Sequence, residues 1–90
     1  KHHLRGLGHQ LKPVVLIGAN GYTEAVRAEI DLALTRHELI KVRVSVGDRD
    51  LRDEAIAKLC DDTGAALIQR IGHIALIFRR NRDKPRITLP

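Results

Sequence analysis

Residues 14–23 read VVLIGANGYT, and the order of residue types in this stretch decides how the chain begins to fold. A short apolar run ends at Gly18, the tetrapeptide GANG occupies residues 18–21, and an amphipathic segment begins after Thr23. The stretch predicts a buried strand, a tight loop and a helix. Glycine allows close approach of a ligand and a helix start presents unpaired N–H groups, so the GANG loop is a candidate phosphate site. The plainer interpretation, that the glycines only turn the chain, stays open.

The chain beyond this stretch continues to alternate strands and helices. Residues 24–37 carry apolar side chains at helical spacing, and Thr23 suits the N-cap of that helix. Residues 39–46 alternate apolar with polar side chains, which predicts a half-buried strand with a basic open face. A second amphipathic helix follows Asp48 or Asp50 and ends near Gly64. Two β-prone runs, residues 65–70 and 74–78, then predict a hairpin.

The N-terminal segment adds one more helix. Leu4, Leu7 and Leu11 share one helical face, and the proline at position 13 ends the helix. The predicted fold class is therefore α/β, a compact α-β-α-β-α-β-β sandwich with a four-stranded mixed sheet. A chain of 90 residues suffices for one domain, so we expect residues 1–90 to form a single domain whose residues 79–90 are a basic tail.

The charge of the chain favours a polyanionic partner. The formal net charge is +5 and the isoelectric point is about 10.0. Acidic residues are concentrated in the two amphipathic helices, whereas basic residues dominate the N-terminal segment, the strands and the C-terminal end. One Tyr, one Phe and no Trp exclude a sheet that stacks bases on rings, so phosphate and sugar are the expected contacts. The basic candidates for these contacts are Lys12, Lys41, Arg43, Arg79 and Arg80.

No arrangement of residues is typical of catalysis or of a metal or cofactor site. The five histidines are terminal or isolated, and the spacing of the acidic residues between positions 48 and 62 fits helix capping. There is no nucleotide-binding motif, and the single cysteine, Cys60, suits core packing. No segment is apolar for long enough to cross a bilayer. We predict a soluble, cytoplasmic, non-enzymatic protein with no cofactor, metal, membrane or small-molecule substrate.

Three runs of sequence together resemble one known family. They are LKPVVLIGANGYTEAV (residues 11–26), RHELIKVRV (residues 36–44) and the run from Gly72 that ends in LIFRR (residues 76–80). They resemble the YhbY-like CRM family, the chloroplast RNA splicing and ribosome maturation domain, and most of all its single-domain bacterial members. The resemblance extends from about Leu4 to Pro90. It implies a fold like the C-terminal domain of translation initiation factor three, RNA binding, and association with the precursor of the large ribosomal subunit.

The resemblance also assigns site residues. The GxxG loop of the family corresponds to Gly18, Ala19, Asn20 and Gly21. In KH modules a GxxG loop clamps the nucleotide backbone. Here the loop follows a strand and not a helix, so the analogy with KH modules extends to the chemistry of the loop and not to the whole module. Asn20 can bond a phosphate or a base. Tyr22 is the one ring beside the loop, and it either contacts RNA or packs as a hydrophobic staple at the helix start.

Two functions of different classes follow from these residues. The first is an RNA-binding protein, with large-subunit ribosomal RNA or a pre-ribosomal particle as partner, that acts in assembly of the large subunit. The alternative is a non-enzymatic adaptor whose basic face docks on an acidic protein, with GANG serving only as a turn. Loss of RNA binding on placing a negative charge in the loop distinguishes the two.

Overall fold

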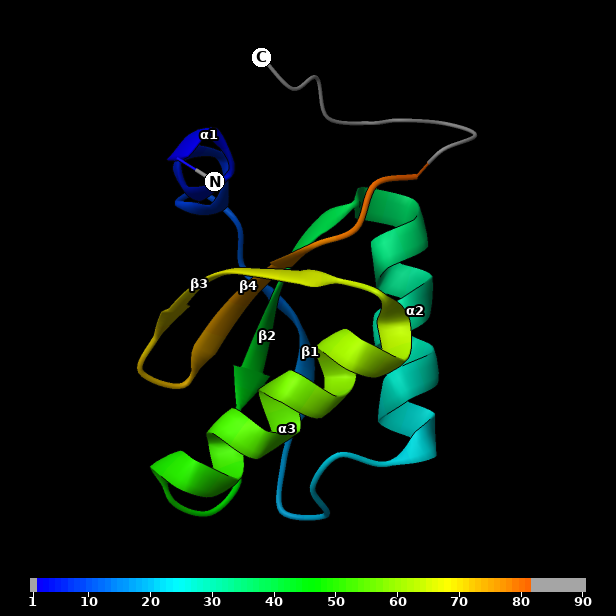
Figure 1. The fold of residues 1–90 in the computed structure, drawn as a ribbon, viewed down its shortest axis with the longest axis vertical. Helices are drawn as coiled ribbons and strands as arrows, with labels where there is room; N and C mark the ends of the chain where they lie inside the picture. Colours follow the sequence, from blue (N-terminus) through cyan, green and yellow to red (C-terminus); the bar gives the residue numbers. More distant parts are fainter. Residues whose placement is uncertain (1, 82–90) are drawn as a thin grey trace.

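The computed structural model of the chain describes residues 2–81, and the predicted basic tail lies outside the described residues from position 82 onward. It contains three helices and four strands in the predicted order (Figure 1). These are α1 (His2–Gly8), β1 (Pro13–Ile17), α2 (Glu24–His37), β2 (Leu39–Val44), α3 (Arg49–Thr63), β3 (Ala66–Ile71) and β4 (Ile74–Phe78).

The four strands form one mixed sheet in the order β1-β2-β4-β3. β1 runs parallel to β2, because α2 carries the chain from one strand to the other, whereas β2–β4 and β3–β4 are antiparallel. The hairpin between β3 and β4 turns at Gly72, which has a φ of 56°. The prediction of an α/β fold with a four-stranded mixed sheet is confirmed.

Helices α2 and α3 cover one face of the sheet and enclose the main core. Alternation along β2 directs Ile40, Val42 and Val44 to this face, and each is at most 2% exposed. They meet Ile30 of α2 and Leu59 of α3, which are fully buried. The predicted strand over residues 39–46 ends two residues early, at Val44.

The opposite face of the sheet is only partly covered. Helix α1 packs over one end of it through Leu4, which joins Leu39, Ile68 and Leu76 in a small second cluster. The helix ends at Gly8, sooner than the leucine pattern predicts, so Leu7 and Leu11 are 42% and 36% exposed. The rest of this face, which we call the open face, leaves aliphatic side chains such as Leu16 and Ile71 exposed.

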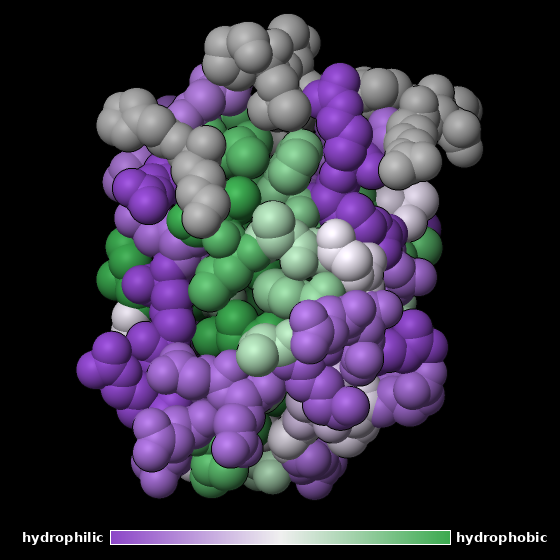
Figure 2. Space-filling view, viewed as in Figure 1, coloured by the Kyte–Doolittle hydropathy of each residue, from purple (hydrophilic) through white to green (hydrophobic). Residues whose placement is uncertain are grey.

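Strand β3 is an edge strand, and the side of the molecule around it is also apolar. Figure 2 shows a band of hydrophobic residues in the upper half of one face, with hydrophilic residues around and below it. Leu67 of β3 is 38% exposed, and a small groove between β3 and α3 is lined by apolar residues such as Ala57 and Leu67 together with the charged side chains of Asp53, Asp61 and Arg70. Cys60 packs against the main core, as predicted, and burial raises the pKa of its thiol.

The loops at the two ends of the sheet are held by specific caps. Thr23 is the N-cap of α2, where its hydroxyl oxygen accepts a hydrogen bond from the Val26 amide at 3.2 Å. Of the two predicted caps for α3, Asp48 holds the position and accepts from the Leu51 amide at 3.0 Å. Gly64 ends α3 with a left-handed φ of 75°.

Candidate nucleic-acid interface

The GANG loop connects the end of β1 to the start of α2, at the bottom of the molecule as drawn in Figure 1. The Gly21 amide donates to the Gly18 carbonyl oxygen at 2.9 Å and closes a tight turn, with Ala19 and Asn20 exposed at its tip. Gly21 has a φ of 75°, whereas the φ of Gly18 is outside the left-handed range. A Cβ at either glycine would meet no atom within 4 Å, so a ligand can approach the backbone closely.

Tyr22 ties the loop to α3. Its ring packs against the main core, and its hydroxyl donates to Asp62 Oδ2 at 2.8 Å. Burial raises the pKa of the Tyr22 hydroxyl, and the hydrogen bond to Asp62 raises it further. The sequence left two roles open for the Tyr22 ring, contact with RNA or packing at the start of the helix. The structure shows that the ring packs against the main core. Contact of Tyr22 with RNA stays a prediction.

The start of α2 carries a pair of charges beside the loop. Glu24 lies in the first turn, and Arg27 one turn later donates from Nε to Glu24 Oε1 at 2.9 Å. The hydrogen bond from Arg27 lowers the pKa of the Glu24 carboxyl, and both groups are open to solvent. The pair leaves the helix start close to neutral, so Glu24 does not oppose an anion there with an unpaired charge.

Lys41 and Arg43 lie on the open face of the sheet. In the register of β2 they alternate with the core residues, and Arg43 stands between Leu16 of β1 and Ile74 of β4. Arg43 Nε donates to Ser45 Oγ at 3.3 Å, and the Ser45 amide donates to the Ile17 carbonyl oxygen at 2.8 Å. Because Ile17 directly precedes Gly18, Arg43 is close to the GANG loop along the sheet.

The acids of the described residues lie mostly on one side of the sheet. None of the four strands contains an acidic residue, whereas α2 and α3 carry most of the acids of the described chain. Those helices cover the core face, and the side chains of Lys41 and Arg43 are on the other one. The open face is therefore basic and apolar, as the strand pattern predicts.

Lys12 lies apart from the loop. It precedes β1 while the GANG loop follows β1, so the length of the strand separates them. Lys12 is exposed and lines a large groove of about 850 Å³ together with Arg36 and His37. The structure does not bring Lys12 and the GANG loop together.

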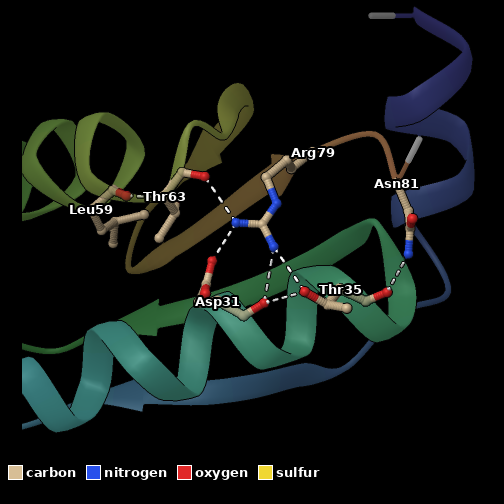
Figure 3. Close-up of polar contacts among 6 residues, drawn as sticks. All are labelled: Asp31, Thr35, Leu59, Thr63, Arg79 and Asn81. Atoms are coloured by element: carbon tan, nitrogen blue, oxygen red, sulfur yellow. Dashed lines mark hydrogen bonds and ion pairs between the residues drawn. The ribbon is translucent and has the colours of Figure 1, made fainter. Parts of the chain in front are cut away.

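Arg79 follows β4 at the opposite end of the molecule and is bonded inside it (Figure 3). Its guanidinium contacts the Asp31 carboxylate and donates to the Asp31 carbonyl oxygen (3.0 Å), the Thr63 carbonyl oxygen (2.9 Å) and Thr35 Oγ1 (3.0 Å). Asn81 Nδ2 donates to the Thr35 carbonyl oxygen at 3.1 Å. We call these residues the Arg79 cluster. Its geometry gives Arg79 a structural role, and its contact with RNA stays a prediction; the neighbouring Arg80 is exposed.

Sequence reasoning missed a second wall beside the GANG loop. The loop from β2 to α3 and one face of α3 lie across a cleft from it, so that Val46, Leu51, Glu54 and Lys58 line the cleft together with Asn20. The positive φ of Gly47 (46°) brings this second loop close to Leu51. The Gly47-Asp48 pair in the sequence signals a turn, but no local signal places that turn beside the GANG loop.

Within residues 2–81, no group of three histidine, cysteine, aspartate or glutamate side chains is arranged to hold a metal ion. In the same part of the chain, no helix combines the length and apolar character needed to cross a membrane.

Comparisons with known proteins give related chains and a related structure. A family model described as the CRS1/YhbY (CRM) domain matches residues 1–79, which confirms the predicted resemblance. A Haemophilus influenzae protein named "RNA-binding protein" is 47% identical over 90 residues, covering 100% of this chain and 90% of the relative. "Probable RNA-binding protein PA4753" of Pseudomonas aeruginosa is 43% identical over 81 residues, covering 90% of this chain and 78% of the relative.

A solved structure has the same fold. The solution structure of the hypothetical protein SAV1595 from Staphylococcus aureus, described as a candidate RNA-binding protein, superposes with a TM-score of 0.84. It is 35% identical in sequence, and the match covers 99% of this chain and 93% of that protein.

Proposed function

Because this chain belongs to the CRS1/YhbY (CRM) domain family, we propose that it binds RNA through the GANG loop and the basic open face of its sheet. The observation that carries the proposal is the absence of acids among the described residues of the open face. Lys41 and Arg43 project from β2 on that face, and Arg43 is the one of the two that lies at the end of the sheet next to the GANG loop. The names of the relatives point to the same class of ligand.

A phosphate of the RNA is held at the junction of the loop and α2. The first amides of a helix have no partner within the helix, and the helix dipole favours an anion at that position. The amide of Gly21 is already used in the turn, so the donors are the amides at the start of α2 and the side chain of Asn20. Ala19 and the two glycines keep the approach open, and the Tyr22 ring borders it.

From the loop the RNA backbone follows the open face past Arg43 and then Lys41. Lys12 and Arg80 extend the contact at the far end of the sheet. The aliphatic side chains between these cations, such as Leu16, contact ribose rather than phosphate. For each phosphate that the protein neutralises, the logarithm of the affinity falls by about 0.7 to 0.9 when the logarithm of the salt concentration rises by one unit. Several such contacts give a steep salt dependence.

We take the RNA to be ribosomal RNA of the large subunit, bound in a cytoplasmic precursor particle, and residues 1–90 to act as one CRM-type domain without catalysis. The support for this finer assignment is the family resemblance of the three runs quoted above. Crosslinking followed by sequencing, on particles fractionated by size, tests it. Enrichment at one region of large-subunit precursor RNA is the expected result, whereas a signal that follows RNA abundance contradicts it.

The loop itself is tested with two substitutions at one position. Gly21→Asp places a negative charge where we place the phosphate, and Gly21→Asn is its neutral control with the same positive φ to satisfy. We expect Gly21→Asp to weaken RNA binding at least about 10-fold relative to Gly21→Asn, as measured by fluorescence anisotropy, because like charges repel. Equal affinities for the two variants, or an affinity that does not change with salt, would favour the protein adaptor.

A further inference from the structure

The cleft beside the GANG loop is a separate feature of this end of the molecule. It has a volume of about 440 Å³, within the range of roughly 300 to 1,000 Å³ that is typical of small-ligand sites. Asn20 and Gly21 form one wall, and α3 with the loop before it forms the other. A nucleotide whose phosphate lies at the GANG loop therefore has its base within reach of the cleft.

The walls of the cleft suit a flat ring more than a phosphate. Leu51 is 52% exposed although it is aliphatic, and Val46 and Ala55 line the cleft beside it. A Cβ on Gly47 would lie 2.3 Å from Leu51 Cδ1, so the glycine lets the loop and the leucine meet. The charged lining of the cleft consists of one acid and one base of α3, Glu54 and Lys58, so the two charges balance and the site suits an uncharged base.

Two polar side chains at the cleft are spaced to read one edge of a base. Glu54 and Lys58 are four positions apart on α3, which puts them on the same face of the helix about 5 to 6 Å apart at Cβ. Among residues 2–81, Glu54 has no hydrogen-bond or ion-pair partner, and Lys58 Nζ is a loose 3.9 Å from Asp62 Oδ2. The pair offers an acceptor beside a donor.

Guanine matches this pair better than the other bases. Its Watson–Crick edge presents the donors N1–H and N2–H₂ side by side, followed by the acceptor O6. The two donors fit the two oxygens of a carboxylate, and O6 accepts from an ammonium. Uracil instead places a carbonyl oxygen on each side of its single N–H, and both oxygens repel a carboxylate.

We propose that the cleft between the GANG loop and α3 binds one unpaired guanine of the RNA, with Glu54 accepting from N1–H and N2–H₂ and Lys58 donating to O6. The proposal rests on the proposed RNA binding and adds a base preference to it. Single-stranded segments are the part of RNA that most proteins read in this way, because their bases can leave the stack.

The test uses short, fluorescently labelled oligouridines with a single central guanosine, adenosine, cytidine or uridine. By fluorescence anisotropy at low salt, we expect the unmodified protein to bind the guanosine probe about 10-fold more tightly than plain oligouridine. Glu54→Ala should reduce that ratio to about 2-fold or less, because the carboxylate that reads the edge is gone. Glu29→Ala, which removes an exposed acid of α2, should retain it.

Each result supports or overturns a distinct claim. A ratio that persists in Glu54→Ala, or an unmodified protein that binds all four probes equally, overturns the guanine site and leaves the RNA proposal in place. If Gly21→Asp and Gly21→Asn bind every probe equally well, the loop proposal fails together with the guanine site. Because Glu54 is exposed on a helix and alanine favours helices, we expect its variant to fold.

Discussion

The two ends of the molecule both bring polar groups to an end of α2, but they hold them in opposite ways. At the GANG end, one turn bond closes the loop, and Ala19 and Asn20 at its tip face solvent. At the other end, the Arg79 side chain is 25% exposed, and carbonyl, carboxylate and hydroxyl oxygens surround its guanidinium. Arg79 has a structural role because the fold itself supplies the acceptors around its guanidinium. Its positive charge alone does not decide between a structural role and binding of a partner.

The Arg79 cluster supplies a hydrogen-bond donor to the carbonyl end of helix α3. The last carbonyl groups of α3 have no amide partner within the helix, and Arg79 donates to one of them, that of Thr63. The same guanidinium reaches Asp31 of α2, so it joins both helices to the end of β4 (Figure 3). At the GANG end, the bond from Tyr22 to Asp62 joins the loop before α2 to α3.

The largest expected effect comes from removing the link at the Arg79 end. We predict that Arg79→Ala lowers the free energy of unfolding by about 3 kcal/mol, because the Asp31 carboxylate and the Thr63 carbonyl lose a charged donor. Arg79→Lys should recover only part of the loss, since lysine lacks the planar fork. Urea denaturation measures both.

Arg80→Ala is the matched control for this comparison, because Arg80 is the next residue and is exposed. We expect its unfolding free energy to fall by much less than that of Arg79→Ala, because water screens the interactions of an exposed cation. If Arg79→Ala were as stable as Arg80→Ala, and bound RNA more weakly than the unmodified protein, Arg79 would belong to the RNA interface and the contrast between the two ends would disappear.

A smaller effect is expected at the loop that faces GANG across the cleft. Gly47→Ala puts a side chain on a backbone with a φ of 46° and crowds Leu51, so we predict a loss of about 1–2 kcal/mol in unfolding free energy. Thermal or urea unfolding measures it. A neutral result would show that this wall of the cleft can rearrange, in contrast to the Arg79 end.

Most of the fold could be predicted because its signals are local. The helix over residues 24–37, its Thr23 cap and the alternation of β2 all depend on near neighbours in the sequence. The leucine spacing of the first segment was less reliable, since burial of Leu7 needs a longer helix than the one that ends at Gly8.

The candidate site was harder to predict because it depends on distant parts of the chain. The GANG loop is visible in the sequence, but the partners of Arg79 are 16 to 48 positions away, and no pattern indicates them. Glu38 is another example, since it is fully buried with a φ of 64°, a conformation that sequence reasoning would reserve for glycine. Its carbonyl oxygen accepts from the Arg79 amide at 2.9 Å.

The link from Tyr22 to Asp62 gives the GANG end a smaller, pH-dependent contribution. We predict that Tyr22→Phe costs about 1 kcal/mol at neutral pH, through the lost hydrogen bond. Because the pKa of Tyr22 is raised above that of free tyrosine, about 10, the contribution of the hydroxyl is complete below that pH and decreases as the pH rises further. The stability difference between the two proteins should therefore shrink in alkali.

This chain has one tyrosine and no tryptophan, so the near-ultraviolet absorbance of tyrosinate reports on Tyr22 alone. Titration of the folded protein should give a midpoint above that of the unfolded protein, and Asp62→Asn should bring it down, since Asp62 contributes after burial. A midpoint at the ordinary value would mean that the hydroxyl is not held, and that the GANG end has no link to α3.

The smallest expected effect on stability is at Gly18, where the two interpretations of the GANG loop differ. An added Cβ would meet nothing within 4 Å, and the φ of Gly18 is not left-handed, so Gly18→Ala should leave the unfolding free energy unchanged or raise it by about 0.5 kcal/mol. Because the methyl group stands where we expect the RNA backbone to approach, affinity for RNA should fall several-fold. Anisotropy and urea unfolding of the same preparation separate the two quantities, and unchanged affinity at unchanged stability would make Gly18 only part of a turn.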